Sequence, residues 1–136
     1  MRSAHMIFGL ATLALAMALP LSAAQASDVS TCDAPGILSA ISSRFHYQSR
    51  EVHHNDLVIE SYTKVHQHRF EEQRKLWPIA RRYCMATAHV SNGHKYAVRY
   101  FIEGGMGLAS IGDNVEFCVS GFDRWNVYNS YCRVAR

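Results

Sequence analysis

The chain has 136 residues, with 14 Lys and Arg against 11 Asp and Glu, 49% hydrophobic residues and 18% charged residues. This composition excludes disorder as the default state, and the length fits one domain rather than a cofactor domain joined to a substrate domain. The net charge of +3 is small and the basic residues are dispersed along the sequence, which argues against a nucleic-acid groove or a membrane-hugging surface. We expect one small ordered domain that binds no nucleic acid.

The N-terminus has the three parts of an export signal. Arg2 supplies a positive charge, residues 7–21 carry no charge, and small residues end at Ala26. The apolar run is shorter than the ~20 residues that a membrane-spanning helix needs. The sequence therefore predicts a cleavable signal peptide over residues 1–26 and a periplasmic domain over residues 27–136, without stable membrane insertion after cleavage.

All four cysteines follow this predicted signal: Cys32, Cys84, Cys118 and Cys132. An even number of cysteines in a small exported domain predicts two disulfides, and the wide spacing is unlike that of a zinc site. Four cysteines permit three pairings, among which the sequence does not choose firmly. If the strands follow sequence order, one strand separates Cys84 from Cys118, beyond the reach of a disulfide. A sheet in sequence order therefore favours Cys32–Cys84 with Cys118–Cys132.

A helix is expected to open at residues 32–35, where Asp33 could cap free N–H groups and Pro35 is tolerated in a first turn. Its apolar stripe comprises Ile37, Leu38, Ile41 and Phe45. Alternating residues then predict a strand over residues 57–67, with the odd-numbered positions from Leu57 to Val65 on one face. The charged residues 69–77 are expected to form a connection or a short helical turn.

A β-hairpin is the best-marked element. Residues 82–90 and 95–103 both alternate, and between them Asn92-Gly93 suits a type I′ turn. Glycines then break the chain, and further strands are expected over residues 115–119 and 125–134. The fold class is therefore α+β, with one N-terminal helix packed on a four- to five-stranded antiparallel sheet.

Histidines offer the only candidate metal ligands. His66 and His68 would share a strand face, and His53 or His54 could bend back as a third ligand. No acidic partner pattern accompanies them, and polar strand faces often carry histidine without any metal. We expect no metal site.

Catalytic motifs are missing from the sequence. It contains no HExxH motif, nucleophile elbow or phosphate-binding glycine loop, and the cysteines are expected to be bridged. Carboxylates such as Glu60, Glu103 and Glu116 could be paired with many other residues, so they indicate no specific catalytic pair. We expect a protein that is not an enzyme and needs no cofactor.

Aromatic and arginine side chains suggest a protein interface instead, because Tyr, Trp and Arg dominate interface energetics. Arg124 and Trp125 follow a predicted turn, and the hairpin turn at residues 91–95 should be exposed. Tyr96 and Tyr100 alternate onto the face of Val98 and Ile102, which favours the core for both.

The positions of Cys84, Cys118, Trp125 and Cys132 in the C-terminal half resemble those of small exported proteins of alphaproteobacteria. Some members are regarded as periplasmic inhibitors of peptidoglycan hydrolases. A second similarity is to the periplasmic lysozyme inhibitors, whose exposed Ser-Gly-x-x-Tyr loop enters the lysozyme cleft. Here Asn92 is inserted between the serine and the glycine of that pattern.

These resemblances imply a cell-envelope binding protein that inhibits a lysozyme or a lytic transglycosylase. A muramidase cleft is lined with carboxylates, which would attract a loop carrying cationic and N–H donors. The expected partner-binding residues are Ser91, Asn92, Gly93, His94, Lys95, Tyr96, Arg124 and Trp125. Two alternatives stay open: a structural or adaptor protein of the envelope, and a histidine-based periplasmic metal-binding protein.

Overall fold

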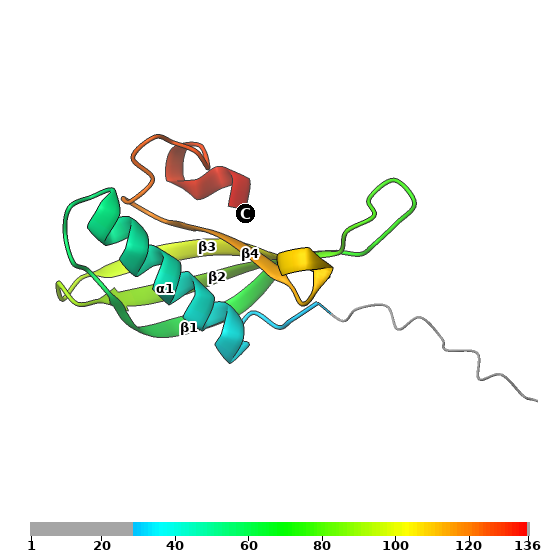
Figure 1. The fold of residues 1–136 in the computed structure, drawn as a ribbon, viewed down its shortest axis with the longest axis horizontal. Helices are drawn as coiled ribbons and strands as arrows, with labels where there is room; N and C mark the ends of the chain where they lie inside the picture. The colour runs from blue at the N-terminus through cyan, green and yellow to red at the C-terminus, as the bar shows by residue number, and fades with distance from the viewer. Residues whose placement is uncertain (1–28, 136) are drawn as a thin grey trace, which may run out of the picture.

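The computed structural model describes residues 29–135, which form one helix packed on a four-stranded antiparallel sheet. The elements in chain order are α1 (Pro35–Glu51), β1 (Ile59–Glu71), β2 (Arg81–Val90), β3 (Lys95–Glu103), the 3-10 turn η1 (Leu108–Ser110), β4 (Asn114–Val119) and the 3-10 segment η2 (Ser130–Ala135). The strands lie in the order β1-β2-β3-β4, and α1 crosses one face of the sheet (Figure 1). The predicted α+β class is confirmed with four strands. The predicted signal peptide lies outside the described residues.

The core lies between α1 and the facing side of the sheet. The helix buries Ile37, Ile41 and Phe45, as its predicted stripe requires. The sheet contributes its inward-facing side chains: Cys84, Ala86, Ala88, Val90, Val98, Tyr100, Ile102, Val115 and Val119. The fully buried Tyr100 donates its hydroxyl to the Cys32 carbonyl over 2.7 Å, which satisfies a polar group that would otherwise be costly to bury. In the described residues, no helix is long and apolar enough to cross a membrane.

The ends of α1 differ in how they are capped. The N-cap is Ala34 without any side-chain bond, so the predicted cap by Asp33 is wrong, while Pro35 occupies the first turn as expected. At the other end the buried Ser49 hydroxyl donates to the Asn55 carbonyl over 3.1 Å and accepts from the Leu57 N–H over 3.0 Å. Ser49 thereby turns the chain toward β1.

Strand β1 is longer and less regular than predicted. Its pairing with β2 shifts register three times between Ile59 and Arg69, so the expected strict alternation is wrong. Tyr62 therefore packs on the core beside Ile59 and Val65, because each extra residue switches the face of those that follow. The strand continues to Glu71, into the segment expected to be a connection.

The β2–β3 hairpin is confirmed, but its turn is not type I′. Gly93 alone in the turn has a positive φ, of 80°, and its N–H donates to the Val90 carbonyl over 2.9 Å. The Val90 N–H in turn donates to the His94 carbonyl over 3.0 Å. This pattern is a three-residue loop with a bulge at Gly93, which Asn-Gly suits equally well.

The predicted fifth strand over residues 125–134 is wrong. Positive φ values at Asn126, Asn129, Tyr131 and Cys132 are incompatible with an extended strand, and the chain instead forms turns that lead into η2. The Cys118–Cys132 disulfide requires this return of the chain to β4.

Both disulfides of the favoured pairing are present. Cys32–Cys84 joins the segment before α1 to the central strand β2, and Cys118–Cys132 joins β4 to η2, with Cα separations of 5.7 and 5.6 Å. Strand β3 lies between Cys84 and Cys118, as the reach argument assumed.

Candidate partner-binding surface

The hairpin tip, residues 91–95, is exposed and held by several hydrogen bonds. The Asn92 side chain accepts from the His94 N–H over 3.0 Å and donates to the Tyr96 hydroxyl over 3.1 Å. Ser91 donates its N–H to the Val58 carbonyl over 2.9 Å, and its hydroxyl accepts from the Val58 N–H over 3.1 Å. These bonds fix the loop at both sides, so little loop entropy would be lost on binding.

An aromatic cluster packs next to the tip, where Tyr96 follows it in β3. The cluster comprises Phe45, His53, Tyr96 and Phe122. The Phe122 ring lies edge-on to Phe45 and to Tyr96, with ring centroids 5.0 Å apart in both pairs, and 5.5 Å from the His53 ring. The His53 Nε2 donates to the Phe122 carbonyl over 3.1 Å, which requires the proton on that nitrogen because a carbonyl only accepts. Phe122 thus connects α1, β3 and the loop after β4.

The loop after β4, residues 120–129, places Arg124 and Trp125 two and three positions beyond Phe122. The Asp123 carboxylate accepts from the Val127 and Tyr128 N–H groups over 2.8 and 2.9 Å. Trp125 is 65% exposed, and the Arg124 guanidinium lies 5.8 Å from its ring centroid. Phe122, which packs on Tyr96 next to the tip, precedes Arg124 and Trp125 in the same loop. The hairpin tip and residues 124 and 125 are two separate regions of the surface.

A hollow of about 270 Å³ borders Trp125. It lies between α1, β4 and the loop after β4, lined among others by Gln48, Phe117, Trp125 and Tyr128. The Tyr128 hydroxyl donates to the Glu116 carboxylate over 2.7 Å. Burial and the neighbouring Glu116 carboxylate raise the pKa of Tyr128, so this side chain stays a neutral donor at neutral pH. The hollow therefore combines exposed aromatic surface with the polar side chains of Gln48 and Tyr128.

The histidines proposed as metal ligands have other neighbours. His66 Nδ1 bonds to the Lys64 carbonyl over 2.7 Å, whereas His53 belongs to the aromatic cluster. A register shift in β1 falls at His68. Within residues 29–135, no group of three or more His, Cys, Asp or Glu side chains could hold a metal ion.

Sequence reasoning missed Phe122 and His53, which support the predicted tip. Apolar spacing did not reveal Phe122, because it stands alone after a turn glycine. Tyr96, expected both in the core and at the interface, is half-buried between His94 and Phe122. Sequence reasoning also missed the loop between β1 and β2, residues 72–80, which lies at the end of the sheet opposite the hairpin tip and exposes Leu76 and Trp77.

No protein-family model, curated protein or solved structure matches this chain. The resemblance to exported alphaproteobacterial proteins and to lysozyme inhibitors stays a prediction. Function is therefore inferred from the residues and geometry described above.

Proposed function

We propose that this protein is an exported binding protein of the cell envelope that inhibits a peptidoglycan hydrolase of the lysozyme or lytic transglycosylase type. It acts without chemistry of its own, by placing the hairpin tip in the carboxylate-lined cleft of the enzyme. The observation that carries the proposal is the tip itself, an exposed loop of residues 91–95 fixed by hydrogen bonds at Ser91 and Asn92.

The chemistry of the tip matches such a cleft. Lys95 supplies a positive charge, and His94 and Asn92 supply N–H groups, all on exposed residues. A glycosidase cleft keeps two carboxyl groups available as acid and as nucleophile or base. Cationic and N–H donors would pair with these groups and exclude substrate, and complementary charge would also speed the encounter.

Two further features are compatible with the proposal. The disulfides suit an oxidising compartment such as the periplasm. Arg124 and Trp125, side chains of the type that dominate protein interfaces, follow Phe122 of the aromatic cluster in the same loop, with Trp125 65% exposed, and would extend the contact beyond the tip.

The test is clearance of cell-wall suspensions by a lysozyme and by a lytic transglycosylase, each with and without an equimolar amount of this protein. We expect inhibition of at least one enzyme, and a loss of inhibition of roughly tenfold or more in His94→Ala/Lys95→Ala, since charged contacts in a cleft contribute more than ~1.4 kcal/mol. The matched control is His68→Ala/Lys75→Ala, which removes the same residue types from exposed positions elsewhere.

Two results would contradict the proposal. Equal inhibition by both double variants would place the contact away from the tip. Absence of inhibition against every hydrolase of these classes would favour an adaptor protein of the envelope.

A further inference from the structure

The end of the sheet opposite the hairpin tip carries an arm, residues 72–80, which connects β1 to β2 and projects from the body of the molecule (Figure 1). Arg74 and Trp77 exchange backbone hydrogen bonds of 2.7 and 2.9 Å, so the arm ends in a tight turn at Lys75 and Leu76. Leu76 is 86% exposed and Trp77 is 64% exposed. Such large apolar side chains at the tip of a projecting loop contribute nothing to the core.

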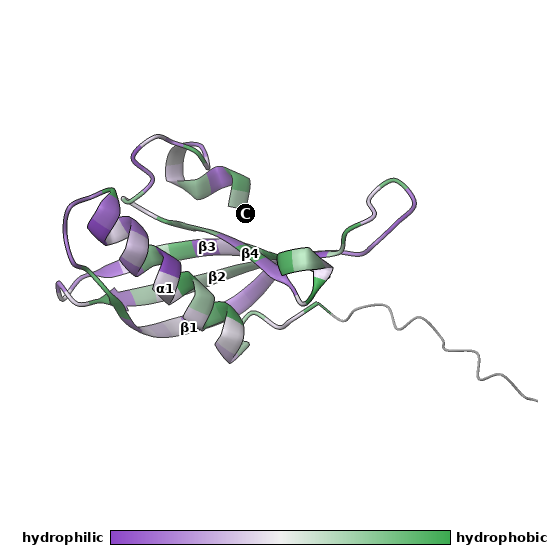
Figure 2. Ribbon diagram, in the orientation of Figure 1, coloured by the Kyte–Doolittle hydropathy of each residue, from purple (hydrophilic) through white to green (hydrophobic). Residues whose placement is uncertain are grey.

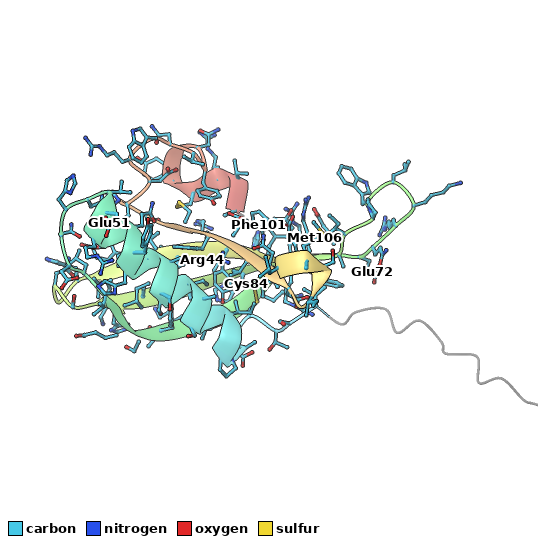
Figure 3. The ribbon with its side chains drawn as sticks, in the orientation of Figure 1. Arg44, Glu51, Glu72, Cys84, Phe101 and Met106 are labelled. Carbon is cyan, nitrogen blue, oxygen red and sulfur yellow. A yellow bond between two sulfur atoms is a disulfide. The ribbon has the colours of Figure 1, made fainter. Side chains whose placement is uncertain are left out.

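A second loop, residues 104–112, presents apolar side chains at the same end. The Gly104 N–H donates to the Ala80 carbonyl over 3.0 Å, which joins the bases of the two loops. Leu108 and Ile111 are 93% and 79% exposed. Figure 2 shows hydrophobic residues in both segments, and Figure 3 places Met106 and Glu72 at this end and Glu51 at the other. We call the arm and this loop together the arm end.

The arm end is also cationic. Residues 69–82 contain five basic and two acidic residues, although the basic residues are dispersed over the sequence as a whole. The Arg69–Glu71 and Arg81–Glu103 ion pairs occupy two of the basic residues. In residues 29–135, neither Arg74 nor Lys75 takes part in an ion pair. Within residues 72–80, Arg74 and Lys75 stand against Glu72, so the arm has a net charge of +1 (two basic minus one acidic residue) beside its exposed Leu and Trp side chains.

The chain enters the domain at the arm end. The Ser30 N–H donates to the Asp113 carboxylate over 2.7 Å, and Arg82 donates to the carbonyls of Val29 and Ser30 over 3.1 and 2.9 Å. The sequence before Val29 contains the uncharged apolar run of residues 7–21. During export this run would hold the arm end next to the bilayer.

We propose that the arm end is a peripheral contact surface for a bilayer containing anionic phospholipid. Trp77 and Leu76 would enter the headgroup region together with Leu108 and Ile111, and Arg74 and Lys75 would pair with lipid phosphates. Tryptophan favours the membrane interface, and basic residues near an anionic surface add attraction. The contact is reversible and involves no spanning segment.

A lipid surface fits these observations better than a protein partner does. Protein-binding loops place their apolar anchors in a compact, well-packed centre, whereas here the four apolar side chains proposed to enter the headgroup region are 64–93% exposed. The Gly107 N–H donates to the Gly112 carbonyl over 2.9 Å, and this bond closes the second loop. The side chains of Leu108 and Ile111 within this loop are exposed. Separate apolar projections with basic neighbours can enter a fluid interface without a complementary pocket.

The chain's two tryptophans provide the test, because Trp77 and Trp125 are almost equally exposed, at 64% and 65%, on opposite parts of the molecule. Protein recovered after export is mixed with vesicles of phosphatidylethanolamine and phosphatidylglycerol, or of phosphatidylcholine alone. In Trp125→Phe, the emission of Trp77 should shift to shorter wavelength, and acrylamide quenching should fall, with the anionic vesicles only. In Trp77→Phe, the emission of Trp125 should change in neither case.

A second pair of variants separates apolar insertion from simple charge attraction. Leu76→Ser/Leu108→Ser should reduce sedimentation with anionic vesicles roughly tenfold or more. The variant lacks two exposed leucine side chains whose transfer from water to the bilayer would favour binding. Val127→Ser/Tyr131→Ser removes comparably exposed apolar groups elsewhere and should bind like the parent protein.

The proposal would be overturned if Trp125 shifted as much as Trp77, if both vesicle types were bound equally, or if the leucine variant bound as well as the parent. A concentration-dependent shift of Trp77 without vesicles would assign the arm end to a second copy of the chain. The variants change exposed residues, and unchanged thermal unfolding would establish that each is folded.

Discussion

Replacing Phe122 with alanine would test whether the aromatic cluster connects the fold to the candidate binding surface. The ring lies against Phe45, His53 and Tyr96, so its removal takes away three edge-on ring contacts. Loss of a fully buried phenylalanine costs ~3–5 kcal/mol, and Phe122 is half-buried, so we expect a loss of ~2–3 kcal/mol in the free energy of unfolding. For a domain of this size that lowers Tm by roughly 8–12 °C.

The measurement is urea unfolding followed by far-UV circular dichroism, with hydrogen exchange at the backbone amides of residues 91–95. Exchange at the tip should accelerate more than exchange in the middle of β2, because Tyr96 loses the ring that it packs on. Phe122→Leu restores apolar volume without ring contacts and should lie between the parent and the alanine variant.

Trp125→Ala is the matched control, since it removes a larger ring that is 65% exposed. We expect a change within ~0.5 kcal/mol. The reasoning is refuted if Trp125→Ala destabilises as much as Phe122→Ala. It is also refuted if Phe122→Ala changes stability by less than ~0.5 kcal/mol, within the range of an ordinary surface substitution.

Two further predictions concern stability. The chain-entropy relation gives ~4 kcal/mol for Cys32–Cys84, with a sequence separation of 52, and ~3 kcal/mol for Cys118–Cys132, with a separation of 14. In urea unfolding, replacing both cysteines of Cys32–Cys84 by alanine should therefore lower the free energy of unfolding more than the same change at Cys118–Cys132. The reverse ranking would contradict the chain-entropy relation. Burial alone would raise the pKa of Asp113, but N–H donors from Ser30 and Gly105 lower it below the ordinary value of 3.8. The carboxylate therefore stabilises the fold above about pH 3.8, and this contribution is lost as pH falls through its lower folded pKa. Asp113→Asn should be less stable than the parent at pH 7, with a difference that shrinks on acidification; a difference independent of pH would exclude this role.

The sequence predicted the elements whose signal is local. The helix stripe at Ile37, Ile41 and Phe45 and the alternation on both sides of Asn92-Gly93 are periodic patterns, and the structure confirms both. The turn type could not be predicted, because Asn-Gly suits a two-residue and a three-residue loop alike. Strand pairing, which aligns Val90 with His94, selects the longer loop.

Elements that depend on distant partners were predicted less well. Residues 125–134 have the alternation of a strand, but Cys132 must return to Cys118, and the backbone bends to allow this. In β1, register shifts bring Tyr62 to the core, where its hydroxyl bonds with Ser42 over 2.9 Å. Neither the disulfide geometry nor the hydroxyl pair is visible in a local pattern.

The same distinction applies to the candidate site. Ser91, Asn92, Gly93, His94 and Lys95 could be recognised as an exposed turn, since turn chemistry is local. The support from Phe122 could not, because Phe45 and Tyr96 come from other elements and meet it only in the folded chain. Sequence patterns thus predicted which residues are exposed at the turn, whereas the structure shows the aromatic packing beneath them.

The two proposed surfaces lie at opposite ends of the β2–β3 hairpin, and this separation makes them independent. Strand β2 has 10 residues, which at about 3.3 Å each span roughly 30 Å. A domain that contacts the bilayer through Leu76 and Trp77, with β2 directed away from it, would present the hairpin tip about that far from the lipid surface. Because the surfaces share no residue, variants at His94 and Lys95 should leave vesicle binding intact, and variants at Leu76 and Leu108 should leave inhibition in solution intact. Coupled losses would instead indicate that one altered region disturbs the whole fold, which unfolding measurements on the same variants would detect.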